Sequence, residues 1–103
     1  MPKVVRINDS LSTGHGCTGT TTLASSNQGV DNVYANNKLI CVKNAPTVSH
    51  AFPPNPPCAP HTAKLNVGSS TVKINNIEVG RHGDSADAGA MLEPGGVTVF
   101  AGP

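Results

Sequence analysis

The sequence predicts an all-β fold built from short hairpins, in a single domain that spans residues 1–103. Apolar and polar residues alternate in its most regular windows, whereas the three- and four-residue spacing of a helix is rare. Glycine and proline contribute 11 and 9 residues and interrupt every longer segment. Hydrophobic types make up 37% of the chain and aromatic types 3%, so we expect a small core that needs a staple or a partner.

Two windows of the same form predict β-hairpins. In residues 72–79, apolar and polar positions alternate on either side of Asn75-Asn76, and residues 33–40 repeat this form around Asn36-Asn37. Asparagine tolerates a positive φ better than other residues that carry a side chain. Each pair therefore suits the two-residue primed turn of a hairpin.

The hairpins belong to a longer internal repeat. Residues 29–36 align with residues 68–75, and residues 95–102 form a third copy. Such internal similarity predicts an architecture of like units. The simplest arrangement is three strand-rich units stacked around a pseudo-threefold axis.

A second repeated element is a short turn that carries an arginine and an aspartate. It spans residues 6–10 and returns at residues 81–85, while residues 42–46 are a degraded copy. Asp9 and Asp84 follow asparagine or glycine in these turns. We interpret both carboxylates as caps of their own backbone rather than as a catalytic pair.

Charge and hydropathy argue against several classes of protein. Seven basic and six acidic residues give a net charge of +1, and the basic residues form no stripe that would bind nucleic acid. No apolar segment approaches the roughly 18 residues of a membrane helix. The polar start at residues 1–9 does not resemble a signal peptide, so we expect synthesis in the cytoplasm. Three cysteines cannot all pair within one chain, and we expect free or metal-bound thiols rather than a disulfide framework.

Three histidines fall in the polar loops between the repeated units. His15 follows the first arginine–aspartate turn, His50 follows its degraded copy at nearly the same distance, and His61 ends a proline-rich segment. Threefold-related units would bring these loops to one end of the molecule, and the prolines would stiffen the segment that joins His50 to His61. The sequence therefore predicts a closed, structural zinc site near that end, with these three imidazoles as ligands.

The fourth ligand is open among several residues. Cys58 lies three residues before His61, close enough for both side chains to bind one ion, and we place it first. Cys17, two residues after the first histidine, and His82 are alternatives, although His82 aligns with strand positions of the other units. Cys41 comes last, because a cysteine inside an apolar segment is usually a small buried hydrophobe.

An enzymatic function finds little support in the sequence. It contains no nucleophile elbow and no His-Glu-x-x-His motif, so we expect a protein that is not an enzyme. The alternative is a small zinc metalloenzyme or ligand-binding β domain, in which the three histidines leave one coordination position open. A secreted adhesion module fits less well because no signal peptide is recognisable.

The order of these motifs resembles that of the PAAR-repeat proteins, the small conical tips of contractile injection machines. The resemblance covers residues 2–102, and its motifs occur in the family's order at residues 4–9 with Gly14-His15, at 68–75, at 79–84 and at 95–100. Val-Val-Arg at residues 4–6 and Val-Gly-Arg at residues 79–81 replace the Pro-Ala-Ala-Arg of the family name. Ala88, before Gly89, stands where many members have a ligand cysteine.

The resemblance implies a cone of short hairpins with a zinc ion near the vertex, held by three histidines and one cysteine. By position, His15 matches the family's early ligand, and His50 and His61 match the ligands of the middle loop. Cys58 takes the place of the missing cysteine.

The resemblance also implies a function and a partner. A protein of this kind is a non-enzymatic tip that caps and sharpens a trimeric β-helical spike, one tip per trimer, and helps it pierce the envelope of a target cell. The spike is of the VgrG type in type VI secretion, or is the central spike of a phage tail, and the sequence does not separate the two. We accordingly expect assembly at the tip of a phage tail in the virion, or secretion with a type VI spike, without an extension domain.

Overall fold

Short antiparallel strands and turns make up the described part of the chain, which confirms the predicted all-β class. The computed structural model describes residues 2–29, 33–52 and 59–102. Its Cα trace is elongated and measures 40 × 25 × 23 Å. The strands are β1 (Ser10–Ser12), β2 (Thr20–Thr22), β3 (Tyr34–Ala35), β4 (Lys38–Leu39), β5 (His50–Phe52), β6 (Ala59–His61), β7 (Lys73–Ile74), β8 (Ile77–Glu78), β9 (Ser85–Ala86) and β10 (Gly89–Met91).

Four of these strands form one antiparallel sheet in the order β2-β1-β10-β9. At its centre β1 pairs with β10, with Leu11 opposite Met91, so that the first and last strands of the chain are neighbours. The other strands form the separate hairpins β3–β4, β5–β6 and β7–β8. A lone two-stranded hairpin is marginally stable in water, so each of these hairpins needs an anchor outside its own ladder.

Both hairpins predicted from the asparagine pairs are confirmed. Strands β3 and β4 enclose Asn36 and Asn37, whose φ angles are 50° and 70°. Strands β7 and β8 enclose Asn75 and Asn76, with φ angles of 51° and 66°. A positive φ at both central residues is typical of the type I′ turn, whose twist matches that of the flanking strands.

The two arginine–aspartate turns share one set of hydrogen bonds. Asp9 Oδ2 accepts from the backbone N–H of Arg6 at 2.7 Å and from its Nε at 3.2 Å. Asp84 Oδ2 accepts from the same two groups of Arg81 at 2.8 and 3.1 Å. Both carboxylates therefore cap their own turns, as predicted, and each is paired with a guanidinium. The degraded copy at residues 42–46 keeps the backbone hydrogen bond of the turn without the arginine or the aspartate.

A closed ring of backbone hydrogen bonds joins the three chain segments that precede these turns. Val5 N–H donates to the Gly80 carbonyl at 3.0 Å, Gly80 N–H to the Cys41 carbonyl at 2.9 Å, and Cys41 N–H to the Val5 carbonyl at 2.9 Å. Two residues further along each segment, a second set of bonds links the same three segments. This set joins Ile7 to Leu39, Lys43 to Glu78, and His82 to Lys3.

The small core lies around this ring and continues on both sides of it. Leu65 is fully buried next to Gly80, and the core consists of two clusters of buried residues. One cluster contains Val5, Leu11, Leu23, Cys41, Ala45, Leu65, Ala86 and Met91. The other contains Val4, Ala35, Ile40, Val42, Val79, Val97 and Ala101. None of these buried residues is aromatic, so the core depends on the close packing of aliphatic and sulfur-containing side chains.

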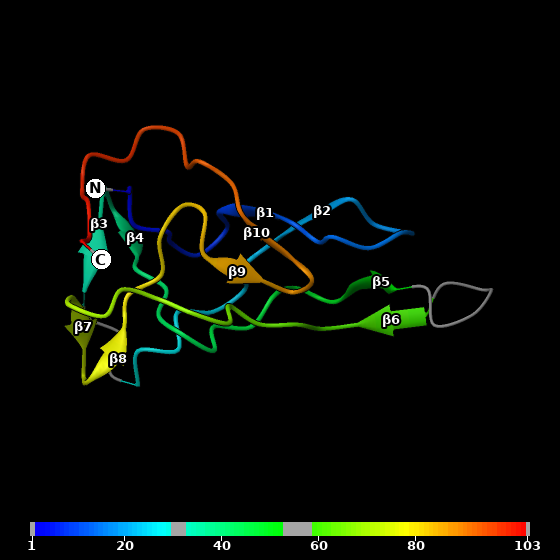
Figure 1. Cartoon of the computed structure of the whole chain (residues 1–103), viewed down its shortest axis with the longest axis horizontal. Helices are drawn as coiled ribbons and strands as arrows, with labels where there is room; N and C mark the ends of the chain where they lie inside the picture. Colours follow the sequence, from blue (N-terminus) through cyan, green and yellow to red (C-terminus); the bar gives the residue numbers. More distant parts are fainter. Residues whose placement is uncertain (1, 30–32, 53–58, 103) are drawn as a thin grey trace.

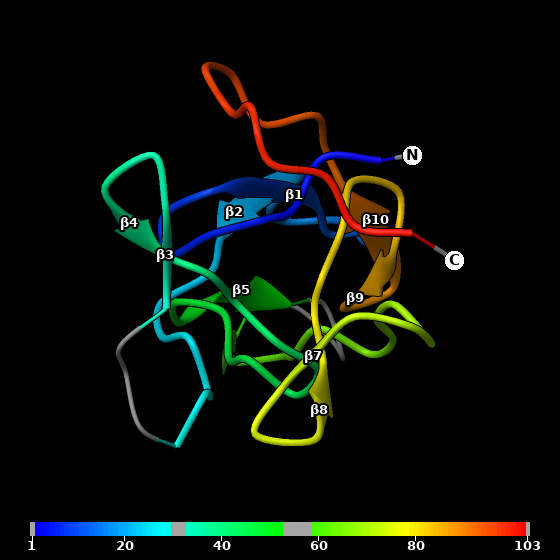
Figure 2. The ribbon, with the colours of Figure 1, turned by 90° about the vertical axis from the view of Figure 1, so that its left-hand side faces the viewer.

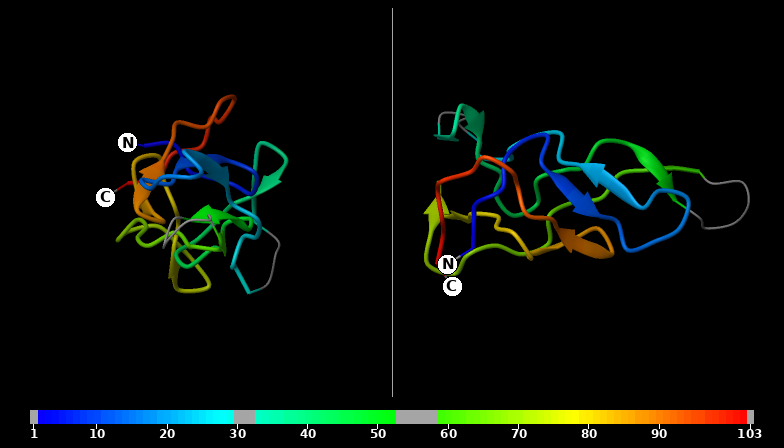
Figure 3. Two further views of the ribbon diagram at one scale, coloured as in Figure 1. Left: turned by 90° about the vertical axis from the view of Figure 1, so that its right-hand side faces the viewer. Right: turned by 90° about the horizontal axis from the view of Figure 1, so that it is seen from above.

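The two ends of the elongated body differ, as Figure 1 shows. One end, here called the wide end, carries β3–β4, β7–β8 and the last described residues. Seen from that side, the two hairpins and the loop that follows β10 project outward around the body (Figure 2). The hairpins β1–β2, β9–β10 and β5–β6 run toward the opposite, narrow end, where β5–β6 lies furthest out (Figure 3).

A substitution at Gly80 tests the importance of the backbone ring. A Cβ at this position would collide with Leu65 Cδ2 and would lie 2.8 Å from Val5 Cγ2. We expect Gly80→Ala to lower the free energy of unfolding by about 1–3 kcal/mol, because the close-packed centre cannot take another methyl group.

The matched control is Gly95→Ala, whose Cβ would meet no atom within 4 Å. This variant should stay within about 0.5 kcal/mol of the wild type in denaturant unfolding. Equal effects of the two substitutions would contradict a ring packed without spare volume.

Candidate metal centre

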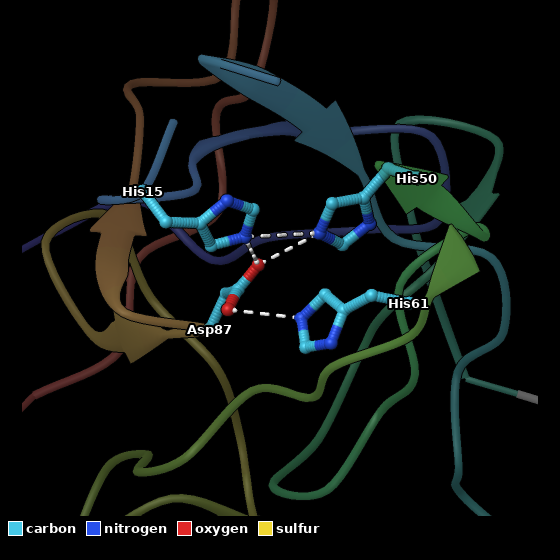
Figure 4. A group of neighbouring side chains, drawn as sticks. All are labelled: His15, His50, His61 and Asp87. Carbon is cyan, nitrogen blue, oxygen red and sulfur yellow. Dashed lines mark hydrogen bonds and ion pairs between the residues drawn. The ribbon is translucent and has the colours of Figure 1, made fainter. Parts of the chain in front are cut away.

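Three hairpins bring four potential metal ligands to one place in the narrow half of the molecule. His15 lies in the loop between β1 and β2, and Asp87 lies in the turn between β9 and β10. His50 begins β5 and His61 ends β6, where the two residues face each other in the strand register. Figure 4 shows the four side chains pointing toward a common centre from these separate segments.

The separations of the four ligand atoms match the size of a single ion. The Nε2 atoms of His15 and His50 both lie 2.8 Å from Asp87 Oδ2 and 3.3 Å from each other. His61 Nε2 lies 3.3 Å from Asp87 Oδ1. With one ligand atom from each residue, all four lie within 4.8 Å of one another. Ligands about 2.0–2.1 Å from a tetrahedral zinc ion lie roughly 3.4 Å apart, so a small adjustment would complete the shell.

Backbone carbonyls orient two of the imidazoles from behind. His15 Nδ1 lies 2.9 Å from the Gly16 carbonyl oxygen, and His50 Nδ1 lies 2.9 Å from the Val48 carbonyl oxygen. A carbonyl oxygen only accepts, so both Nδ1 atoms donate. In the neutral ring, Nε2 then carries a lone pair, and both lone pairs face the Asp87 carboxylate. Histidines that bind a metal usually donate their other ring N–H to an acceptor such as a backbone carbonyl.

Electron-rich atoms that meet so closely need a positive charge between them. The side chains of His15, His50 and Asp87 are 8%, 4% and 5% exposed, so water screens them little, and that of His61 is 25% exposed. A divalent cation satisfies the four groups together, whereas protonation of the imidazoles satisfies them only in part. The donor set of this structure therefore fits a metal ion.

The site also shifts the acidity of its own groups. Burial works to raise the pKa of the Asp87 carboxyl, but its hydrogen bonds with His15, His50 and His61 outweigh this effect and hold the pKa below its ordinary value. The pKa of His15 is raised, chiefly by the hydrogen bond to the Gly16 carbonyl, and the Asp87 carboxylate adds to the shift.

Two glycines allow the hairpins β1–β2 and β9–β10 to pack closely against each other. A Cβ at Gly14 would collide with the Ala88 carbonyl, and one at Gly89 would collide with the Ser12 carbonyl. The same contact includes a 2.9 Å hydrogen bond from Ala88 N–H to the Thr13 carbonyl. This backbone contact holds the β1–β2 loop against the β9–β10 turn, and so places a histidine beside an aspartate 72 positions away.

The hairpin β5–β6 reaches the site differently. In the part of the chain that the structure describes, its ladder contains two strands and is separate from the four-stranded sheet. A hydrogen bond from Ala51 N–H to Thr18 Oγ1, 3.1 Å long, and the contacts of His50 and His61 tie it to the other hairpins. An ion bound by all four residues would cross-link β5–β6 to both of its neighbours.

A depression of about 520 Å³ opens beside the carboxylate end of the site. It is lined by Asn44, Pro46, Thr62, Ala63, Lys64, Asn66 and Asp87. Of the four potential ligands, Asp87 is the one that lines this depression.

The structure brings His15, His50 and His61 together, and it adds Asp87, which sequence reasoning did not single out. Cys58, our first choice for the fourth ligand, lies outside the described residues. Asp87 directly precedes Ala88, the position where the family resemblance puts a cysteine. This place in the sequence, next to the position of the family's cysteine, was the signal that could have identified Asp87 as a ligand.

The other candidate ligands are not members of this group. Cys17 is disulfide-bonded, so the expectation of free or metal-bound thiols is wrong for this residue. An odd number of cysteines prevents all of them from pairing but still allows one pair. His82 is exposed and does not belong to the group of four. Cys41 is fully buried in the core, with Sγ 3.4 Å from the Ser25 carbonyl oxygen, as its apolar segment predicts.

No known family model matches the chain, and no curated protein matches it. No helix in the described ranges is long and apolar enough to cross a bilayer. Fold and site together thus define a small all-β protein with a four-residue group that could hold a metal ion.

Asp87→Asn tests the centre with little change of shape. The variant loses the negative charge, and we expect its affinity for zinc to fall by about 100-fold, because even outer-shell changes typically cost 10–100-fold. The measurement is a competition titration with a colorimetric chelator. Glu93→Gln removes an exposed carboxylate and should bind zinc like the wild type. Equal affinities of Asp87→Asn and the wild type would exclude Asp87 as a ligand.

The metal-free and metal-loaded proteins should respond to pH in opposite directions. Without metal, the raised pKa of His15 contributes stability that is fully present below about pH 6.5 and is lost as the pH rises through the folded-state value. With metal, protons compete for the imidazoles, so Tm should fall as the pH drops. Melting curves between about pH 5 and 8, with and without a chelator, measure both slopes. His15→Gln should flatten the metal-free slope, and parallel slopes in the two states would contradict the site.

Proposed function

We propose that this chain is the metal-stabilised tip of a trimeric β-helical spike in a contractile injection machine, and that its role is mechanical rather than catalytic. The observation that carries the proposal is the meeting of three hairpins at His15, His50, His61 and Asp87 in the narrow half of an elongated body (Figures 1 and 4). The machine is a phage tail or a type VI secretion system.

The backbone rings support three similar units around one axis. In the ring of Val5, Cys41 and Gly80, each residue donates to one of the other two and accepts from the third. These residues directly precede the aligned turns at residues 6–10, 42–46 and 81–85. A chain with three such faces is suited to a trimer, whose blunt end presents three equal sets of unpaired strand groups.

Exposed apolar side chains at the wide end support the same partner. Tyr34 in β3, Val72 beside β7, and Val99 and Phe100 in the last segment are 58%, 39%, 40% and 48% exposed. These segments lie together at the wide end (Figures 1 and 2). Monomeric proteins rarely keep large contiguous apolar surfaces in water. We assign this surface, the docking face, to the contact with the spike.

A structural ion suits the narrow half, because little hydrophobic core can form there. Within the described residues, the hairpin β5–β6 pairs with no further strand, and it lies furthest from the wide end. Three imidazoles and a carboxylate supply four protein ligands, and a shell closed by four protein ligands is a feature of structural rather than catalytic zinc sites. The free energy of metal binding would add to the stability of the fold, so the tip would resist the load of piercing an envelope.

The proposal is tested by mixing the protein with purified trimeric spikes of the VgrG type and of a phage tail. We expect one chain per trimer with one of them, measured by light scattering. Any other stoichiometry, or no complex with either spike, would contradict the proposal.

Substitutions on the docking face test where the spike binds. Tyr34→Asp combined with Phe100→Asp should weaken the complex by at least about 10-fold, because aromatic side chains at an interface centre often dominate affinity. Leu92→Asp changes another exposed apolar residue, 41% accessible and outside these segments, and should have no effect. If Leu92→Asp weakens the complex and the double substitution does not, the spike binds outside the docking face.

A further inference from the structure

We infer that the ion is held without any thiolate, by three imidazoles and the Asp87 carboxylate, and that it therefore stays bound when the thiols of the protein are oxidised. This inference rests on the metal centre of the proposed function and names the chemistry of its ion.

The first support is that the four groups complete a shell by themselves. His15 and His50 share Asp87 Oδ2, and His61 contacts Oδ1 of the same carboxylate. The His61 ring stands nearly perpendicular to the other two, at 86° and 88°. Figure 4 shows the four side chains reaching the centre from separate segments, as the ligands of a tetrahedral ion do. No fifth group is needed to close the shell.

The second support is the state of the cysteines in the described residues. Cys41 packs in the core, and Cys17 is disulfide-bonded. A disulfide sulfur has no thiolate to offer to a metal. Cys17 lies only two residues after His15, in the loop that carries this ligand to the site. The same loop thus holds an oxidised cysteine and a metal-binding imidazole, so the centre is compatible with an oxidised protein.

The consequence follows from the chemistry of the donor atoms. Peroxide or disulfide-forming reagents convert thiolates to sulfenic acids or disulfides, which no longer hold zinc. Imidazole and carboxylate groups do not undergo these reactions. A nitrogen and oxygen donor set also selects borderline divalent cations such as zinc, cobalt or ferrous iron over the softer ions that thiolates prefer. A tip with this site would keep its ion in the oxidising surroundings outside a cell.

The test uses zinc-loaded full-length protein and two variants, Cys58→Ser and Asp87→Cys. Each is treated with hydrogen peroxide, and the released zinc is measured with a colorimetric chelator. We expect the wild type and Cys58→Ser to bind one zinc ion per chain and to keep it after oxidation. Asp87→Cys should bind zinc through the new thiolate and lose most of it after oxidation.

Two outcomes would overturn the inference. One is a Cys58→Ser variant that folds but binds no zinc, and the other is a wild type that releases zinc as completely as Asp87→Cys does. If Asp87→Cys does not fold, cobalt-substituted wild type decides, since a sulfur-to-cobalt charge-transfer band would show a thiolate ligand. Failure of the proposed function is distinguishable, because zinc would then be retained while the protein forms no complex with any spike.

Discussion

The meeting of electron-rich atoms from three separate hairpins is the constraint on which the narrow half of the molecule depends. Backbone carbonyls hold Nδ1 of His15 and His50, so the Nε2 lone pairs of these rings face the buried Asp87 carboxylate. Without a positive charge at this point, the three hairpins would repel one another where they have little apolar surface to share. A bound cation would convert the same contact into a link between them. The charge requirement therefore connects the stability of this half to an ion.

The wide half is held together in another way. Its segments are joined by the backbone ring of Val5, Cys41 and Gly80 and by two clusters of buried, non-aromatic side chains, one of which extends to Leu11 and Met91 in the four-stranded sheet. Such a core has no aromatic filler, so its cohesion comes from close packing, and a glycine is required where the three segments meet. The molecule thus combines a packed half, which exposes several apolar side chains, with a half whose hairpins a bound ion would cross-link.

Local chemistry made much of the fold predictable. The asparagine pairs at residues 36–37 and 75–76 determine their turns through the φ values that asparagine tolerates, and both hairpins formed as predicted. Asp9 and Asp84 cap turns whose partners lie three residues away. Asp87 was not predictable from local chemistry in the same way, and its place beside Ala88, the position of the family's ligand cysteine, was its one sequence signal. Its partners are 26 to 72 positions away and reach it only through the packing of other hairpins.

The amino-acid sequence by itself determined the all-β class, the turns, and the set of histidines available for a metal. These features depend on contacts within a few residues, where backbone preferences decide the outcome. Only the tertiary structure decided which side chains meet: that Asp87 joins His15, His50 and His61, and that Cys17 is disulfide-bonded. Such encounters depend on how distant segments pack around the backbone ring, and residue spacing along the chain does not contain that information.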